Sequence, residues 1–238
     1  MKALLLCSVL AASAMGARQD ATYDLVWHPR SGDVMTFKIQ LAIDSTPEKY
    51  IFTATTKNKV VKVKPNGDYD IETTTTDQKV KHGTHEDPGD DDTKPTTDTY
   101  NSKGEKIASS EDNDPAEEGN PATDALDSVT DGLKPQAPVK IGEKWTALIE
   151  PSAKLKREAG KVEYTLVGID KQGAYQVLKI AYNYHQTEKD TPVTVDGFIM
   201  LSQQDFSIVR VEANIKGGKF SPDPDFPAGD ATFSLIRD

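Results

Sequence analysis

The chain of 238 residues contains a single cysteine, Cys7, which lies within its first seventeen residues. The part that follows has no disulfide, no cysteine metal ligand and no thiol nucleophile, so packing alone must hold its fold together. Long apolar runs are also lacking, since no stretch approaches the roughly 18 apolar residues that a membrane helix needs. The glycine patterns of phosphate loops and dinucleotide-binding folds are missing as well.

The first seventeen residues have the pattern of a secretory signal peptide. Lys2 supplies the basic start, Ala3–Leu10 the short apolar segment, and the small residues between Ala12 and Ala17 a place for cleavage. Cys7 follows the first leucines too early to be the lipid-anchored cysteine of a lipoprotein. We therefore expect an exported protein, periplasmic or extracellular, without a transmembrane segment.

The chain has fewer basic than acidic residues, and the excess of acidic residues is concentrated in one segment. Of the 38 acidic and 28 basic residues, twelve acids and three lysines lie between His85 and Glu118, so the remainder is nearly balanced. A surface of this kind does not attract nucleic acid, and we expect no DNA or RNA partner. The segment at about 83–121 is rich in Asp, Glu, Pro, Gly, Thr and Ser. We expect a flexible acidic insertion there, because it has too little apolar surface to offset the entropy of ordering. Within it, Thr99–Ser102 is the one candidate for an edge strand.

Most of the remaining chain alternates between apolar and polar residues. The clearest example runs from Met35 to Ile43, where apolar residues alternate with Thr, Lys and Gln. This period is typical of an antiparallel strand with one buried face. Asn66-Gly67 separates two further runs and predicts a tight hairpin. Similar runs between 139 and 216 bring the expected number of strands to about ten.

Only one segment has a helical period. It begins at Pro121, places Leu126, Val129 and Leu133 on one stripe, and ends before Pro135. The predicted fold is therefore mainly all-β: a single curved antiparallel sheet or half-barrel with one short helix packed on it. The signal peptide occupies 1–17, and residues 18–238 form a single β-rich domain.

The order of several short motifs resembles a known class of proteins. The chain has Gly32-Asp33 before its clearest strand, then Asn66-Gly67-Asp68-Tyr69, Tyr100-Asn101-Ser102-Lys103-Gly104, and the run from Pro138 to Trp145. This order resembles uncharacterised exported β-proteins of bacteria, many of them lipoproteins, that are grouped as a domain of unknown function. In architecture these are similar to LolA and LppX, open half-barrels covered by helices. The resemblance implies a location in the bacterial envelope and a fold that can hold acyl chains.

No catalytic signature is present. The chain has no G-x-S-x-G turn, and we expect neither an enzyme nor a cofactor. A hydrolase whose carboxylates are assembled in space stays open as a remote alternative. Asp90–Asp92 and Asp112–Asp114 lack the ligand spacing of an EF-hand, so calcium binding by the acidic segment is left open.

One short segment carries the best candidates for metal ligands: His82, His85, Glu86 and Asp87. Two histidines three residues apart with a following carboxylate can hold zinc or copper if a helix or tight turn makes them converge. The segment is neither helical nor apolar. We therefore interpret it as a solvated loop and predict no metal site.

The leading functional hypothesis is a non-enzymatic carrier that holds an apolar or lipid-like ligand between helix and sheet. The six candidate ligand-binding residues are Phe37, Ile39 and Leu41 from the sheet, and Leu126, Val129 and Leu133 from the helix. Because side chains alternate along a strand, Lys38 and Gln40 are expected on the opposite face. The aromatic residues of the strands, such as Trp27, Phe37, Tyr69 and Phe206, either fill the core or line the cavity.

The main alternative is a monomeric structural or interaction module with a filled core. It would recruit an envelope protein through an exposed strand edge or through the acidic segment. A measurement of the interior volume separates the two hypotheses, because a filled core leaves no room for a ligand.

Overall fold

The computed structural model describes residues 21–44, 49–89, 94–110, 121–152, 158–187, 192–218, 220 and 229–238. The predicted signal peptide and the acidic runs at 90–92 and 112–114 lie outside these ranges. Among the described residues, no helix has both the length and the apolar character needed to cross a bilayer.

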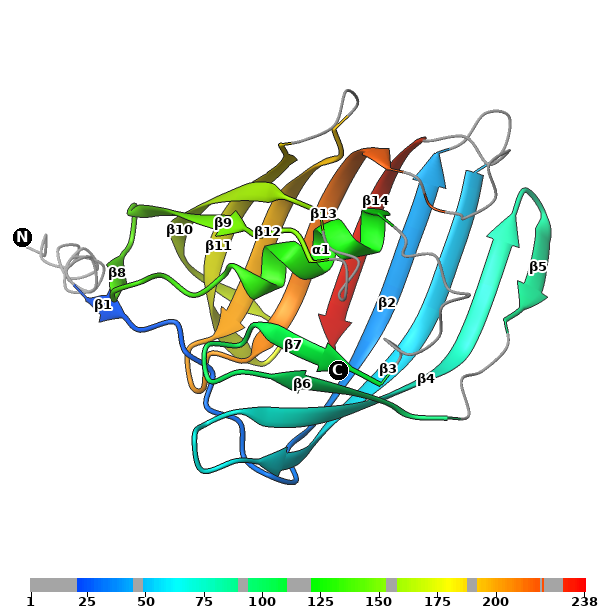
Figure 1. The fold of residues 1–238 in the computed structure, drawn as a ribbon. Coiled ribbons are helices and arrows are strands. Elements are labelled where there is room, and N and C mark those ends of the chain that lie inside the picture. Colours follow the sequence, from blue (N-terminus) through cyan, green and yellow to red (C-terminus); the bar gives the residue numbers. More distant parts are fainter. Residues whose placement is uncertain are drawn as a thin grey trace, which may run out of the picture.

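A twelve-stranded antiparallel sheet forms most of the molecule (Figure 1). Its strands are β2 (Val34–Asp44), β3 (Lys49–Val63), β4 (Tyr69–His82), β5 (His85–Pro88), β6 (Thr96–Tyr100), β7 (Lys106–Ser109), β9 (Lys144–Ile149), β10 (Gly160–Gln172), β11 (Tyr175–Gln186), β12 (Thr194–Ser202), β13 (Ile208–Gly218) and β14 (Gly229–Arg237). Their spatial order is β7-β6-β4-β3-β2-β14-β13-β12-β11-β10-β9, and β5 pairs with β4 outside this path. β1 (Thr22–Tyr23) and β8 (Val139–Lys140) form a separate two-stranded sheet.

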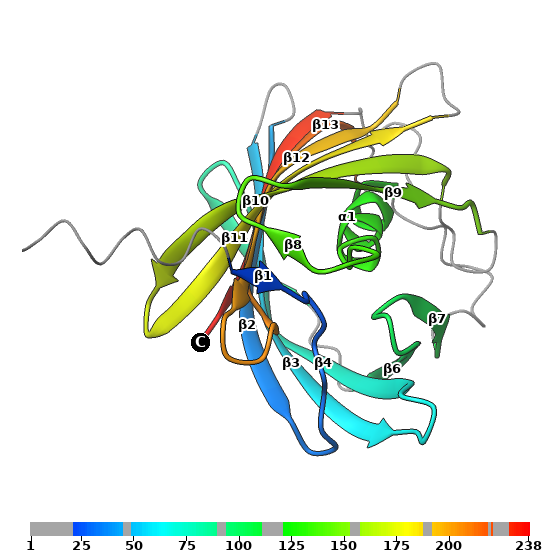
Figure 2. The same cartoon turned by 90° about the vertical axis from the view of Figure 1, so that its left-hand side faces the viewer.

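The sheet curves around the single described helix, α1 (Pro121–Asp131), as Figure 2 shows. The helix lies on the concave side, against β11, β12 and β13. Within the described part of the chain, the edge strands β7 and β9 do not pair with each other, so the sheet stays open. The predicted curved sheet with one packed helix is thus confirmed.

The largest difference from the sequence-based expectation lies in the segment at 83–121, which we predicted to be a flexible insertion with at most an edge strand at Thr99–Ser102. Its described residues instead contain β5, β6 and β7. β6 pairs with β4 from Tyr69↔Tyr100 to Thr73↔Thr96, and Tyr100 packs against the buried Tyr69. Composition did not predict β5 and β7 and gave β6 only as an edge-strand candidate, because these strands are stabilised by pairing with neighbouring strands and not by an apolar period of their own.

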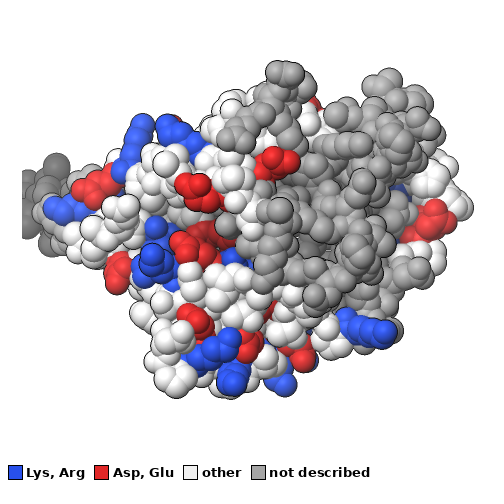
Figure 3. Space-filling view, in the orientation of Figure 1, with Lys and Arg blue, Asp and Glu red and all other residues white. Residues whose placement is uncertain are grey.

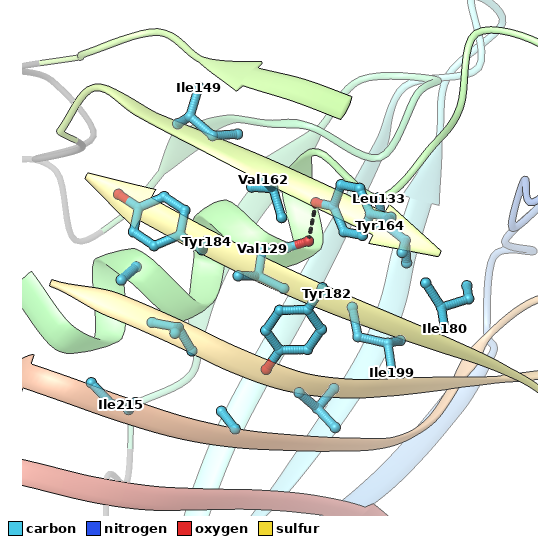
Figure 4. Packing of buried hydrophobic residues seen from close by; sticks show 14 of the residues in the cluster. Val129, Leu133, Ile149, Val162, Tyr164, Ile180, Tyr182, Tyr184, Ile199 and Ile215 are labelled. Atoms are coloured by element: carbon cyan, nitrogen blue, oxygen red, sulfur yellow. Dashed lines mark hydrogen bonds between the residues drawn. The ribbon is translucent and has the colours of Figure 1, made fainter. Parts of the chain in front are cut away.

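The core between α1 and the sheet is closely filled (Figure 4). Val129 on the helix and Val162 and Tyr164 on β10 have no exposed surface. The Tyr164 hydroxyl donates a hydrogen bond of 2.7 Å to the carbonyl oxygen of Val129. The Trp145 ring stacks on Tyr164 with 5.1 Å between ring centroids, and its Nε1 donates to the carbonyl oxygen of Leu133 at 3.1 Å. The bond to Val129 satisfies a carbonyl of the last helical turn, where carbonyl groups lack partners within the helix.

We predict that Tyr164→Phe lowers the free energy of unfolding by about 1–2 kcal/mol, because the buried Val129 carbonyl loses its side-chain donor. Urea unfolding followed by circular dichroism measures the change. Tyr175→Phe is the matched control, because Tyr175 is only half-buried; we expect a change within about 0.5 kcal/mol. Equal losses in the two variants would contradict the role given to this hydrogen bond.

Candidate functional site

The six predicted ligand-binding residues occupy different environments. Val129 is fully buried in the core, and Leu126 and Leu41 are half-buried against the same core. Ile39 is half-buried, whereas Lys38 and Gln40 are exposed, as the alternation of the strand predicted. The structure brings Phe37 and Leu133 together at one cavity, with exposed fractions of 3% and 9%.

This cavity has a volume of about 190 Å³ and is partly open to solvent. It lies where the concave face of β2–β4, the end of α1 and the turn between β12 and β13 meet, and we call it the aromatic pocket. Its apolar wall includes Leu25, Trp27, Phe37, Tyr69, Leu133 and Phe206. The sequence placed the ligand under α1, but that space is filled by core side chains. The pocket lies beside the helix end.

Three aromatic rings form one side of the pocket. The Tyr69 ring stacks on Tyr100 with centroids 5.4 Å apart, and the Trp27 ring meets Tyr69 edge-on at 5.5 Å. They come from β4, β6 and the segment before β2, which are brought together by the sheet. Phe206, in the β12–β13 turn, also lines the pocket and has a positive φ of 59°. Such a backbone conformation is an outlier for a bulky residue.

The sequence indicated that the aromatic strand residues fill the core or line a cavity, but of these only Phe37 was chosen as a candidate ligand-binding residue. Trp27, Tyr69 and Phe206 could have been chosen from the pattern, since they lie at the ends of apolar runs or in a turn. The pattern gave little reason to choose Tyr100, because it lies in the acidic segment. That these four residues meet depends on pairing between distant strands, which no local pattern encodes.

A polar cluster on β4 and β6 holds the Tyr100 side of the pocket in place. The Asp70 carboxylate accepts hydrogen bonds from the Lys64 ammonium at 3.0 Å and the Thr99 hydroxyl at 2.9 Å. Burial alone would raise the pKa of Asp70. The hydrogen bonds from Lys64 and Thr99, with the charges of Lys64 and Lys62, outweigh burial and lower this pKa below its ordinary value.

A second set of charges links β7 to α1. The Lys106 ammonium forms an ion pair with Asp127 at 3.2 Å. Burial alone would lower the pKa of Lys106, but Asp127, Asp98 and Asp131 raise it, so Lys106 remains charged. Burial, together with the charge of Asp131, raises the pKa of Tyr69 to about 12. The Tyr69 hydroxyl therefore stays protonated at ordinary pH.

Among the described residues that line the pocket, three are charged: Asp131, Lys103 and Lys134. On the face of the molecule in Figure 3, acidic and basic side chains are interspersed over the described residues.

The candidate metal ligands do not lie in a loop, which corrects our sequence-based interpretation. His82 ends β4, and His85 and Asp87 belong to β5. The ligand atoms of these three residues all lie within 4.8 Å of one another. Glu86, the fourth candidate, instead pairs with Lys79 at 3.0 Å.

Comparisons with known proteins assign this chain to no family. No protein-family model and no curated protein matches the chain. A solved structure, DynF from the dynemicin biosynthesis pathway of Micromonospora chersina, is 7% identical to this chain, with a TM-score of 0.21. The alignment covers 97% of this chain and 92% of DynF. A likeness of this size carries no functional argument, so the site must be interpreted from its own residues.

We predict that Asp70→Asn lowers the free energy of unfolding near neutral pH by on the order of 1 kcal/mol, because the charge-assisted bonds to Lys64 and Thr99 are weakened. The folded pKa of Asp70 is depressed, so its carboxylate stabilises the fold above the unfolded pKa. This stabilisation is lost as the pH falls through the folded pKa. The difference between the two proteins in urea unfolding should therefore shrink as the pH falls below the unfolded pKa of an aspartate, about 3.9.

Asp44→Asn is the matched control for this experiment. Asp44 is 62% exposed in its ion pair with Lys49, and exposed pairs contribute little to stability. A deficit of Asp70→Asn that stays constant with pH would contradict the electrostatic role of Asp70.

Proposed function

We propose that this protein is a non-enzymatic binding module that holds the apolar part of a small ligand in the aromatic pocket. The observation that carries the proposal is a cavity of about 190 Å³ with Trp27, Phe37, Tyr69, Tyr100 and Phe206 in its lining. Apolar cavities of about 150 Å³ are large enough to bind benzene or xenon. Aromatic walls favour a flat or branched apolar group.

The size of the pocket limits the ligand class. The interior under α1 is occupied by side chains such as Val129 and Tyr164, which have no exposed surface. A long acyl chain therefore has no room there. The ligand is an apolar molecule about the size of one ring, or a lipid-like molecule that inserts only its end.

A polar groove adjoins the pocket and suits the other end of such a ligand. The two share Val26, Trp27, Met35 and Phe206 as lining residues. The groove adds His28, Arg30, Asp33, Asp205 and Arg237. An amphipathic ligand can place its apolar end in the pocket and hydrogen-bonding groups in the groove. The unusual φ of Phe206, between pocket and groove, supports a functional role for this turn.

The place of action follows from the predicted signal peptide at residues 1–17. We propose that the protein is exported and binds its ligand in the periplasm or outside the cell, as an envelope protein of bacteria. A carrier role fits an open pocket that exchanges its ligand with solvent.

The alternative function, an interaction module with a filled core, is favoured by the packed interior under α1. It differs from the carrier in its prediction for the aromatic pocket. A pure interaction module has no saturable site for small apolar molecules at that position.

Tryptophan fluorescence tests the proposal, because the chain has two tryptophans and only Trp27 lines the pocket. In Trp145→Phe, Trp27 is the one remaining tryptophan, so the emission reports on the pocket alone. We expect toluene to change its emission saturably. Hexadecanoate should bind no more tightly than a short-chain acid, because only its end is inserted. Calorimetry on the unmodified protein checks the toluene affinity.

A cavity-filling variant provides the decisive comparison. Thr130 lines the pocket, and Thr130→Phe should weaken toluene binding at least about tenfold by occupying the volume. Thr165→Phe is the matched control, because Thr165 is half-buried on the face of β10 opposite Tyr164 and Leu166. Absence of saturable binding, or equal binding in both variants, would refute the pocket as a ligand site.

A further inference from the structure

The hairpin formed by β4 and β5 brings three metal-binding side chains to one face. Its turn consists of Gly83 and Thr84, and His82 pairs directly with His85 across it. Gly83 has a φ of 57°, the left-handed conformation that two-residue hairpin turns require. The sequence alone did not predict this turn, so it gave no reason for the two histidines to converge.

The pleat of the strands explains why these side chains meet. Residues directly opposite in an antiparallel pair share a face, so His82 and His85 lie on the same side. Residues two apart along a strand also share a face, which adds Asp87 to that side. Glu86 falls on the opposite side, where it pairs with Lys79.

The donor atoms are spaced as a metal site requires. Nε2 of His85 lies 2.9 Å from Oδ1 of Asp87, and Nε2 of His82 lies 3.5 Å from Oδ2 of the same carboxylate. Ligands at about 2.0 Å from a tetrahedral zinc ion lie about 3.3 Å from one another. These two separations bracket this value, and all three donor atoms lie within 4.8 Å of one another, so side-chain rotations can bring them to one ion.

The surroundings hold the histidines in position. The ring of Tyr50, which pairs with His82 on β3, lies 5.8 Å from the His82 ring at an interplanar angle of 27°. The His82 and His85 rings meet edge-on at 5.3 Å. Their side chains are 36% and 66% exposed, so an ion can reach them directly from solvent.

We propose that His82, His85 and Asp87 form a three-ligand site for a divalent transition metal ion of the zinc and copper class. Two imidazole nitrogens and one carboxylate oxygen match the preference of these ions, whereas calcium and magnesium favour sites made of oxygen alone. Three protein ligands leave a coordination position for water or for a donor from another molecule. The site is separate from the aromatic pocket, and its test does not depend on the proposed ligand.

Calorimetric titration of chelator-treated protein with Zn²⁺ tests the site. We expect one saturable ion per chain, and weaker binding of Ca²⁺ than of Zn²⁺. His82→Gln, His85→Gln and Asp87→Asn should each weaken zinc binding at least about tenfold, because each removes one ligand. Circular dichroism on each variant verifies that the fold is retained.

The chain offers close controls for each ligand type. Glu86→Gln alters a carboxylate in the same hairpin, and His28→Gln and His185→Gln remove the other two of the four histidines. Residues 18–238 contain no thiol, so no cysteine control is needed. All three variants should bind zinc as the unmodified protein does. In histidine NMR spectra of the unmodified protein, Zn²⁺ should perturb His82 and His85 and leave His28 and His185 unchanged.

Several results would overturn the site. These are the absence of saturable zinc binding, zinc affinity that survives the loss of both His82 and His85, or Ca²⁺ affinity equal to that for Zn²⁺. NMR perturbation centred on His28 or His185 would equally reject it. An intact toluene site with no zinc binding would refute the metal site alone.

Discussion

The pairing of β2 with β14 is the constraint on which the rest of the structure depends. It joins the first long strand to the last strand of the chain, from Phe37↔Arg237 to Asp44↔Asp230. The other ladders of the twelve-stranded sheet connect strands that are near in sequence. Without this contact, β3–β7 and β9–β13 would have no shared sheet. Because it is made, Phe37 and Tyr69 can line the same pocket as Phe206.

The concave face of this sheet has two different regions. Beneath α1 it is filled, with Tyr164 bonded to the helix backbone and Trp145 stacked on Tyr164. Beyond the end of the helix, the aromatic pocket remains open between β2–β4 and the β12–β13 turn. One region gives the fold its stability. The other leaves accessible apolar surface that a small ligand can cover, and this division is the physical basis of the proposed binding function.

Sequence patterns were sufficient for elements that carry their own periodicity or turn signal. The alternation of Met35–Ile43 predicted β2, Asn66-Gly67 predicted the β3–β4 hairpin, and the stripe of Leu126 and Val129 predicted α1. Strands β5 and β7 were missed, and β6 was foreseen only as an edge-strand candidate at Thr99–Ser102, because these strands are stabilised by pairing with neighbouring strands. The same difference applies to the candidate sites. Phe37 and Leu133 were predicted because they lie on the apolar faces of their strand and helical segment. Tyr100 and the convergence of His82 with His85 could not be predicted in this way, because they depend on pairing between strands.

The central claim is that the open part of the concave face is an apolar binding site, and xenon binding in crystals tests it directly. Xenon enters apolar cavities of this size without needing hydrogen bonds. We predict anomalous density between Trp27, Tyr69 and Leu133, beside the end of α1. Crystals in which these side chains fill the space, or in which xenon binds only elsewhere, would contradict the account.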